Sequence, residues 1–303
     1  MKKEDSVSIS AQIGAYIAKT APSVRYTLDE LAAARATFSE EDLLEMQEIG
    51  LYDGDFEKFY VIREFLSEIG LGDVADGEYI LGIFQNAKKL DSREFTADPY
   101  MTILRSLPAK CGKFTLLPSF YDKGEILCYD MPDFSGELVL PRLAFFTKRV
   151  AFPTLYENER PWMSICPSEI NSMREAIKAA HGKVLVLGLG LGYYAWSVSQ
   201  LPEVESVTVV ELSGEVIKLF RENIEPRLDF GGKLSIVQSD AIRYLEGVKA
   251  GDYDFCFADI WEGAVDGAGW YRKIRPHDIR LSDTEFAYWI EDAILAYLAS
   301  GDD

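Results

Sequence analysis

The sequence predicts an α/β protein with a mostly parallel sheet, preceded by a helical domain and a small antiparallel β unit. The first observation is an apolar run that leads into three evenly spaced glycines, over residues 183–192. The second is the succession of strand-like and helix-like segments that follows, as far as Asp259. The third is a change of hydrophobic periodicity, from a helical repeat before about residue 105 to alternation after residue 113.

Residues 1 to about 105 are predicted to be mostly helical. Apolar residues recur at helical spacing in three segments, 8–20, 56–69 and 79–89. Thr27 with Glu30 forms a capping-box pattern, and Ser39 begins another helix with acidic residues in its first turn. We expect the acidic runs to be solvated helix faces. A lid or a protein-binding module is the functional alternative.

Strand-like alternation follows from Lys113 onward. The predicted strands are 114–120, 126–129 and 137–146. A loop is expected over residues 158–169, and it contains Trp162 and Met163, which are costly to expose. Packing between domains explains these side chains on one interpretation. On the other, Trp162 and Ser164 line a ligand site.

A buried strand and a glycine-rich turn form the centre of the predicted sheet. The run K-V-L-V-L has no polar alternation, which suits a parallel strand buried on both faces. The turn after it contains Gly188, Gly190 and Gly192. Glycines there allow a sharp turn and let a ligand approach without meeting a Cβ. A helix is expected to begin at Tyr193.

Three acidic residues mark the ends of the later strands. The strands are expected over 203–212, 233–238 and 253–258. Glu211 lies at the end of the first, Asp240 after the second and Asp259 after the third. In an open α/β sheet the carboxyl ends of the strands form the ligand-binding edge. We therefore expect these three carboxylates to lie near the glycine turn.

The glycine spacing separates two classes of cofactor. A dinucleotide fingerprint would place Gly or Ala at position 193, where this chain has Tyr193. With Glu211 and the later Ser239-Asp240-Ala241, the G-x-G-x-G pattern resembles class I S-adenosylmethionine (SAM)-dependent methyltransferases over residues 167–261. Their spermidine-synthase-like branch is the most similar. The resemblance implies a Rossmann-like sheet of the methyltransferase type, and it makes an NAD enzyme the least favoured alternative.

The resemblance also implies cofactor-binding residues. The methionine part of SAM would be lined by Gly188, Gly190 and Gly192. Glu211 would bind the ribose hydroxyls, and Asp240 with Ala241 would hold the adenine. Alternatives from the residues themselves stay open, because Glu211 could be a surface acid and Asp240 could be the N-cap of the next helix.

Asp259 corresponds to the family's position beside the reacting centre. It would position or deprotonate the acceptor, and its alternative is a cap on local backbone N–H groups. The fourth strand ends F-A-D-I-W, without the paired aspartates of aminopropyltransferases or the N-P-P-Y of amino methyltransferases. We therefore predict a SAM-dependent methyltransferase acting on an unidentified small-molecule or protein acceptor.

Two other functions remain open. An aminopropyltransferase would bind decarboxylated SAM and a polyamine, which an acidic surface suits. A non-catalytic SAM-binding or scaffold protein is favoured by the short segment after Asp259, which has 44 residues where about three strands are expected. The sheet is therefore predicted to be C-terminally shortened, unless N-terminal strands replace the missing ones.

The expected domains are 1–105 (helical), 106–165 (antiparallel unit and connecting loop) and 166–303 (SAM-binding). In spermidine synthases such an antiparallel unit helps to close the site and can support oligomers. By that resemblance a homodimer is one expected assembly.

Composition limits the partners and the compartment. A formal net charge of −19 disfavours nucleic acid and anionic lipid and favours a small molecule or a cation, although an ordinary acidic surface also explains it. The four cysteines and two histidines have no metal-site spacing, so no metal is expected. Neither a signal-type segment nor an apolar run of membrane length is present, which predicts a cytoplasmic protein with reduced thiols and no membrane partner.

Overall fold

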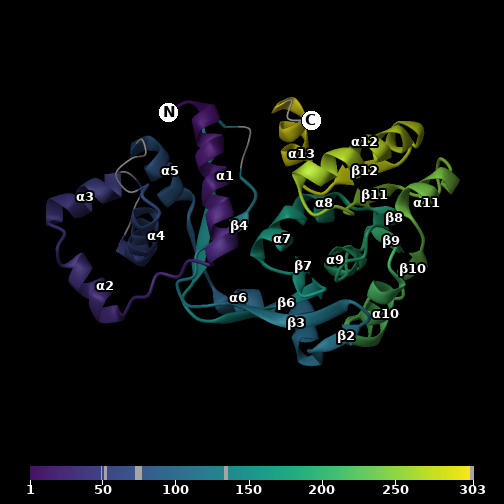
Figure 1. The fold of residues 1–303 in the computed structure, drawn as a ribbon, viewed down its shortest axis with the longest axis horizontal. Helices are drawn as coiled ribbons and strands as arrows, with labels where there is room; N and C mark the ends of the chain where they lie inside the picture. Colours follow the sequence, from purple (N-terminus) through teal and green to yellow (C-terminus); the bar gives the residue numbers. More distant parts are fainter. Residues whose placement is uncertain (49, 51–52, 72–76, 133–135, 301–303) are drawn as a thin grey trace. The chain divides into compact units, whose positions relative to one another are not determined.

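The computed structural model describes residues 1–303 except 49, 51–52, 72–76, 133–135 and 301–303 (Figure 1). The chain forms two compact units. Unit 1 comprises Met1–Thr96 and Phe120–Val150, and unit 2 comprises Ala97–Ser119 and Ala151–Asp303. The chain thus enters unit 2, returns to unit 1 and enters unit 2 again. The domain boundaries expected near residues 105 and 165 stay a prediction.

Unit 1 begins with helices. The predicted ones are α1 (Lys3–Thr20), α2 (Leu28–Arg35), α3 (Glu40–Glu48), α4 (Phe56–Glu68) and α5 (Gly77–Asn86), and the structure adds η1 (Asp53–Asp55) and α6 (Ser92–Ala97). The capping box before α2 is confirmed: Thr27 N donates to Glu30 Oε2 at 2.6 Å, and Glu30 N donates to Thr27 Oγ1 at 3.1 Å. Ser39 and Asp42 exchange the equivalent hydrogen bonds at the start of α3.

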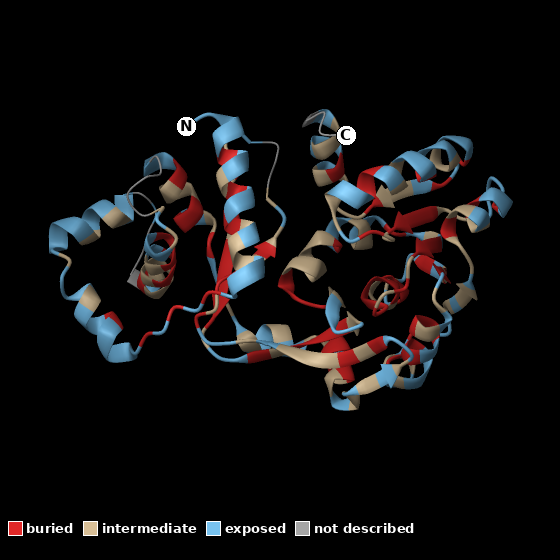
Figure 2. Ribbon diagram, in the orientation of Figure 1, coloured by how far each residue is buried: buried red, intermediate tan, exposed pale blue. Residues whose placement is uncertain are grey.

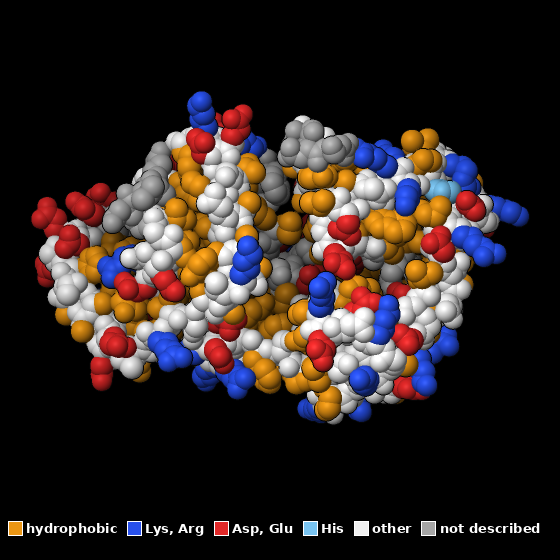
Figure 3. All heavy atoms as spheres, in the orientation of Figure 1, with side chains coloured by type: hydrophobic (Ala, Val, Ile, Leu, Met, Phe, Trp, Pro, Cys, Tyr) orange, Lys and Arg blue, Asp and Glu red, His pale blue; other side chains and the backbone are white. Residues whose placement is uncertain are grey.

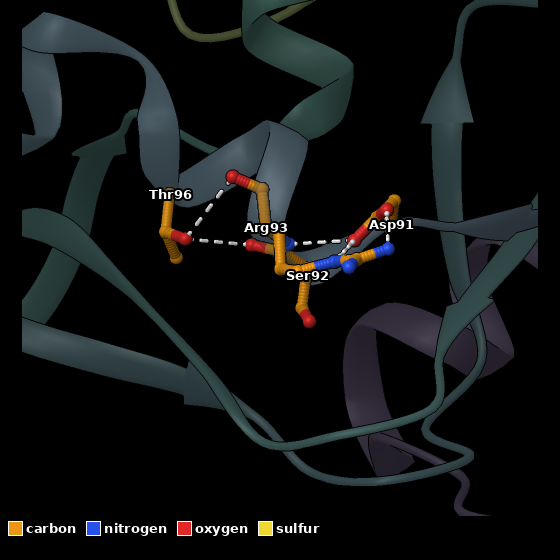
Figure 4. A network of polar contacts seen from close by, with 4 residues as sticks. All are labelled: Asp91, Ser92, Arg93 and Thr96. Carbon is orange, nitrogen blue, oxygen red and sulfur yellow. Dashed lines mark hydrogen bonds and ion pairs between the residues drawn. The ribbon is translucent and has the colours of Figure 1, made fainter.

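The first turn of α6 is held by its own polar side chains (Figure 4). Asp91 Oδ1 accepts a hydrogen bond from Arg93 N at 2.7 Å, and Asp91 Oδ2 pairs with the Arg93 guanidinium at 2.9 Å. Thr96 Oγ1 donates to the Ser92 carbonyl at 2.7 Å. The hydrogen bonds from Arg93 lower the pKa of Asp91. Local chemistry therefore explains where this short helix begins.

A small mixed sheet completes unit 1. Its strands are β1 (Lys88–Leu90), β5 (Arg142–Phe146) and β4 (Leu127–Asp130), in the order β1-β5-β4. β1 is parallel to β5, and β4 is antiparallel to it. The sheet packs with the helices around one apolar core that includes Ile13, Phe65, Ile83 and Phe145. The strand expected over 126–129 thus belongs to this sheet as β4, and of the one expected over 137–146 only residues 142–146 form a strand, β5.

The antiparallel β unit of unit 2 is made from other strands. They are β2 (Ala109–Cys111), β3 (Phe114–Tyr121), β6 (Val150–Glu157) and β7 (Arg160–Ser164), in the order β2-β3-β6-β7, and the 3-10 segment η2 (Pro99–Ser106) precedes them. Part of the expected loop over 158–169 is therefore strand β7. Asn158 and Glu159 both have positive φ, at 46° and 70°, which gives a tight hairpin turn. Pro161 lies within β7 and lowers its strand propensity, so propensity alone does not predict this strand.

The main sheet of unit 2 has five parallel strands. They are β8 (Gly182–Leu187), β9 (Val204–Glu211), β10 (Leu234–Gln238), β11 (Phe255–Ala258) and β12 (Glu285–Tyr288), in the order β10-β9-β8-β11-β12. The central strands β8 and β11 are largely buried, as Figure 2 shows. Strand order reverses between β8 and β11, and ligands of open α/β sheets bind at such a point. Among the described residues, no strand from before residue 182 joins this sheet, which agrees with the predicted shortened sheet.

Helices alternate with these strands. They are α7 (Pro167–Ser172), α8 (Arg174–Ala179), α9 (Tyr193–Ser199), α10 (Gly214–Asn223), η3 (Glu225–Arg227), α11 (Ala241–Gly247), α12 (Ala264–Arg280) and α13 (Glu291–Ser300). α7 and α8 are separate helices that meet at Met173. Trp289 Nε1 donates to Ser172 Oγ at 2.8 Å, so α7 is held beside the end of β12. Cys256 is a buried core residue of β11.

Helix α3 of unit 1 has an acidic surface. Figure 3 shows acidic side chains over α3, at the left edge of the view. Glu40, Glu41 and Asp42 in the first turn of α3 are exposed, which confirms the expectation of a solvated helix face. Across the described part of the chain, no helix combines the length and apolar character that crossing a membrane requires.

We expect the unit 1 core to depend on the apolar face of α4. Leu66 is 1% exposed and Leu44 on α3 is 60% exposed, so they form a matched pair of leucines. Leu66→Ala should lower the free energy of unfolding by about 2–5 kcal/mol, because it removes buried apolar atoms and leaves a cavity. Leu44→Ala should change it by less than about 0.5 kcal/mol. Urea titration of both variants checks this, and equal effects would contradict the assignment of the core.

Candidate functional site

A cavity of about 360 Å³ lies at the carboxyl ends of the parallel strands, within unit 2. Its wall includes Gly188 and Gly190 after β8, Glu211 at the end of β9, Asp240 after β10 and Asp259 after β11. These residues are up to 71 positions apart in the sequence. Parallel pairing brings them together, because it aligns all the strand ends on one edge. The cavity size is within the roughly 300–1,000 Å³ usual for small-molecule sites.

Two of the glycines are required by close approach. Gly188 has φ +99°, and a Cβ there would overlap the backbone carbonyl oxygen of Asp259. Gly190 has φ +51°, and a Cβ there would overlap the Met163 sulfur. Both residues therefore satisfy a conformational and a steric requirement that other side chains do not meet. Gly188 and Gly190 thus contribute backbone to the cavity wall, and the Met163 side chain lies against Gly190.

Glu211 is a buried carboxylate and not a surface acid. Its side chain is 7% exposed. Oε2 accepts a hydrogen bond from Leu189 N at 3.0 Å, and Oε1 accepts one from Ser213 N at 2.7 Å. The residue thus ties the glycine turn to the segment after β9. Each carboxylate oxygen has a second lone pair, so the group can still accept hydrogen bonds from a ligand.

Asp240 has two roles in the structure. Its Oδ1 accepts a hydrogen bond from Arg243 N at 2.9 Å, which makes it the N-cap of α11. It also lines the cavity, together with the adjacent Ala241. The two interpretations left open by the sequence are therefore compatible, because capping uses only one of the two carboxylate oxygens.

Asp259 differs from the other acids of the cavity. Its backbone N–H donates to the Leu187 carbonyl at 2.9 Å, but among the described residues none donates a hydrogen bond to its carboxylate. The carboxylate is therefore not a cap on local backbone N–H groups. Burial, and then the charge of Glu169, raise the pKa of Asp259 well above its ordinary value.

Glu169 is a second carboxyl group near the strand ends. It lies in the first turn of α7, the helix that the Trp289–Ser172 hydrogen bond holds beside β12. Burial raises the pKa of Glu169 to about 7. The sequence suggested no role for this residue, because a lone Glu at a helix start is an ordinary feature.

The cavity wall is strongly acidic. Of its described residues, six are acidic and Lys113 alone is basic; the acidic residues are Glu157, Glu211, Asp240, Asp259, Glu262 and Asp266. Lys113 is paired with Glu157, and this hydrogen bond raises the pKa of Lys113. Asp266 accepts hydrogen bonds from Glu262 N and Gly263 N, each at 2.9 Å. The remaining charge favours a cationic ligand.

Four aromatic rings contribute to the apolar part of the wall. Phe114 of β3 and Trp162 of β7 are in contact, with ring centroids 5.4 Å apart. Trp261 and Trp270, from the segment after β11 and from α12, also line the cavity. Flat apolar surfaces next to carboxylates suit a ligand with both a planar ring and positive charge.

The structure does not bring every predicted residue to the cavity. Gly192 is the N-cap of α9, and a Cβ there would overlap the Phe220 ring. Ser164 pairs with Thr154 at the end of β7 and is not part of the wall. Trp162 is part of it. Whether any of these residues contacts a ligand stays a prediction.

Sequence reasoning missed several residues of the wall. Lys113, Phe114 and Glu157 come from hairpins that lie at least 30 residues before the glycine turn, and no motif marks them. Glu262 and Trp270 lie within 11 residues after Asp259. Their position after a strand end was the one sequence feature that could have predicted a place in the wall. The part of the chain that the structure describes contains no group of His, Cys, Asp and Glu that could hold a metal ion.

The family comparison matches the segment that contains most of this cavity wall. Residues 168–269, about a third of the sequence, match the family model described as the spermine/spermidine synthase domain. This segment has a spermidine-synthase-like fold. It contains β8 to β11 with the glycine turn and the three carboxylates at their ends, whereas Lys113, Phe114 and Trp162 of the wall lie before it.

Two solved structures illustrate the likeness. Monomeric WbdD matches with 16% identity over 39% of this chain and 28% of its own, at a TM-score of 0.29. A human methyltransferase 10 domain containing protein matches with 12% identity over 45% of this chain and 72% of its own, at a TM-score of 0.35. At these scores neither supports an argument by itself. None of the curated proteins matches the chain.

We expect Glu169 to make stability depend on pH. Its pKa in the folded protein, about 7, is above its ordinary value of 4.5, so folding favours the protonated form. That contribution is fully present below pH 4.5 and is lost as pH rises through 7. The stability of Glu169→Gln relative to wild type should therefore increase by about 2 kcal/mol between pH 5 and pH 8. Urea titrations at the two pH values measure this.

Glu175→Gln is the matched control. Glu175 lies on α8, is exposed and pairs with Lys178. Its effect should be nearly the same at both pH values. A pH-independent effect of Glu169→Gln would contradict the burial of this carboxyl group.

Proposed function

We propose that the chain is a SAM-dependent methyltransferase that binds its cofactor in the cavity at the strand ends and acts on a small-molecule or protein acceptor. The observation that carries the proposal is the convergence of the glycine turn, Glu211, Asp240 and Asp259 on one cavity. The spermidine-synthase-like domain supports it, because that fold is associated with SAM or its decarboxylated form.

The described residues fit the cofactor. Glu211 retains lone pairs for ribose hydroxyls after accepting two backbone hydrogen bonds. Asp240 retains one carboxylate oxygen for the adenine amino group after capping α11. Gly188 and Gly190 leave backbone at the wall where the methionine part would lie. The excess of acidic side chains complements a sulfonium cation.

Bound SAM would supply an activated methyl group, so the protein has to align an acceptor and remove a proton where one is lost. Asp259 suits both tasks. Its carboxylate accepts no hydrogen bond from a described residue, lies at the end of β11 and lines the cavity. Burial and the charge of Glu169 raise its pKa, so its ionised form is a stronger base than an ordinary Asp carboxylate and suits proton removal from an acceptor.

Charge favours one second candidate. An aminopropyltransferase would use decarboxylated SAM, which lacks the carboxylate that a basic group would pair with. Lys113, the one basic residue of the described wall, is already paired with Glu157. This observation supports a ligand with no carboxylate, although the chain lacks the paired aspartates of aminopropyltransferases after β11.

Calorimetric titration with SAM, decarboxylated SAM and NAD tests the cofactor. We expect SAM to bind, and Glu211→Gln to weaken it at least about tenfold, because an amide nitrogen would replace one acceptor oxygen. Glu215→Gln, on α10 and outside the cavity wall, is the control and should bind like wild type. Thermal melting verifies that both variants fold. Tighter binding of decarboxylated SAM would favour the second candidate, and no binding of any of the three would reject both.

Asp259→Asn tests the proposed base. We expect turnover with amine or hydroxyl acceptors to fall about 100-fold, because the amide cannot take the proton, while SAM affinity changes by less than about threefold. Single-turnover methyl transfer and calorimetry measure the two quantities. Unchanged turnover would remove Asp259 from the mechanism. Retained SAM binding without turnover in the wild type, across amine, hydroxyl and thiol acceptors, would instead favour a SAM-binding scaffold.

A further inference from the structure

Both peptide groups of Leu191 are held by side chains from outside the spermidine-synthase-like domain. Leu191 lies in the turn between Gly190 and Gly192. Its N–H donates a hydrogen bond to Met163 Sδ at 3.0 Å, and its carbonyl accepts one from the Tyr100 hydroxyl. Tyr100 and Met163 both precede residue 168, where the family match begins. The turn is therefore fixed by contacts that the family comparison does not include.

Tyr100 is well placed to hold a backbone group. It lies on η2, it is 0% exposed, and its ring packs against Tyr193 and Trp196, with centroid distances of 5.0 Å and 5.7 Å. The rings of Tyr193 and Trp196 and the complete burial of Tyr100 restrict its side chain. Its hydroxyl can then fix the Leu191 carbonyl without loss of side-chain freedom at the moment a ligand binds.

Asp98 connects the same segment to helix α9. One carboxylate oxygen accepts from Tyr100 N at 2.9 Å, and the other accepts from the Tyr193 hydroxyl at 3.0 Å. η2 is thus tied to the last part of the glycine turn and to the helix that follows it. This arrangement gives a reason for Tyr193 at a position where dinucleotide-binding sites have Gly or Ala, because its ring and hydroxyl both contact η2.

A glycine turn needs such restraints if it is to bind a ligand without a large ordering cost. Glycine has more conformational freedom than any other residue, and Gly188, Gly190 and Gly192 all have positive φ. Glu211 holds Leu189 N–H at one end of the turn. Met163 and Tyr100 hold Leu191 at the other. Unlike Glu211 and Met163, Tyr100 is not part of the cavity wall, so any influence it has on a ligand acts through the turn.

We infer that Tyr100 is a positioning residue for the ligand-binding turn: its hydroxyl holds the Leu191 carbonyl and keeps residues 188–192 in the conformation that faces the cavity. The inference rests on the proposed function for the identity of the ligand. It assigns the segment before the β hairpins to the ligand-binding machinery of unit 2.

Tyr100→Phe tests this, with Tyr194→Phe as the matched control. Tyr194 is also buried, and its hydroxyl donates to a backbone carbonyl, that of Ala176, at 3.0 Å. Hydrogen–deuterium exchange without ligand, followed on peptides that cover residues 186–196, reports on the turn itself. We expect exchange at Leu189 to Gly192 to be about tenfold faster in Tyr100→Phe and unchanged in Tyr194→Phe. The dissociation constant for SAM should rise about fivefold in the first variant only.

The outcomes separate this inference from the proposed function. Unchanged exchange in Tyr100→Phe, or equal increases in both variants, would overturn the inference whatever SAM does. Faster exchange of the turn in Tyr100→Phe alone, with no SAM binding by the wild type, would uphold the positioning role and reject the proposed cofactor. If Tyr100→Phe does not fold, Asp98→Asn keeps the ring and weakens the tie to Tyr193. It should accelerate exchange of the turn in the same direction, and no acceleration would overturn the inference.

Discussion

The position of β8 in the middle of the parallel sheet constrains the rest of unit 2. β9 and β11 pair with its two edges, and Val184 to Leu187 are buried. At the carboxyl end of β8, the backbone carbonyl of Asp259, which follows the neighbouring strand β11, lies too close to position 188 for any Cβ there. A turn of glycines is the consequence, and it places exposed backbone where the carboxyl ends of the neighbouring strands also arrive.

At this carboxyl edge of the sheet, three carboxylates have different surroundings and therefore different hydrogen bonds. Glu211 is buried and accepts hydrogen bonds from two backbone N–H groups, which hold the glycine turn in place. Its remaining lone pairs are available to a ligand in the cavity. One carboxylate oxygen of Asp240 accepts the hydrogen bond that caps the start of α11. Asp259 accepts no hydrogen bond from a described residue, and burial and Glu169 raise its pKa. The three carboxylates of this cavity thus differ in how many backbone hydrogen bonds they accept: Glu211 accepts two, Asp240 accepts one and Asp259 accepts none from a described residue. A carboxylate without such bonds and with a raised pKa suits proton transfer.

The helices and strands that local rules explain were predictable. The capping box at Thr27, the cap at Asp240 and the apolar run of β8 each contain their own physical reason within a few residues. Strand β7 was missed because Pro161 lowers its strand propensity, and the turn at Asn158 and Glu159 has no glycine to announce it. The strands over 126–146 were assigned to one antiparallel unit with β3, although β4 and β5 form a separate sheet with β1, because alternation does not specify which strands pair.

The sequence by itself determined the strands of the main sheet, the glycine turn and the acidic residues at the strand ends, because each is marked by residues that are close together in the chain. Only the tertiary structure decided which residues complete the cavity. Phe114 and Trp162 reach it from separate hairpins, and Tyr100 reaches the turn behind it from 91 residues away. These contacts depend on how elements that are distant in the chain pack together. Residue spacing in the sequence reports local helices and strands and does not indicate which of them pack together.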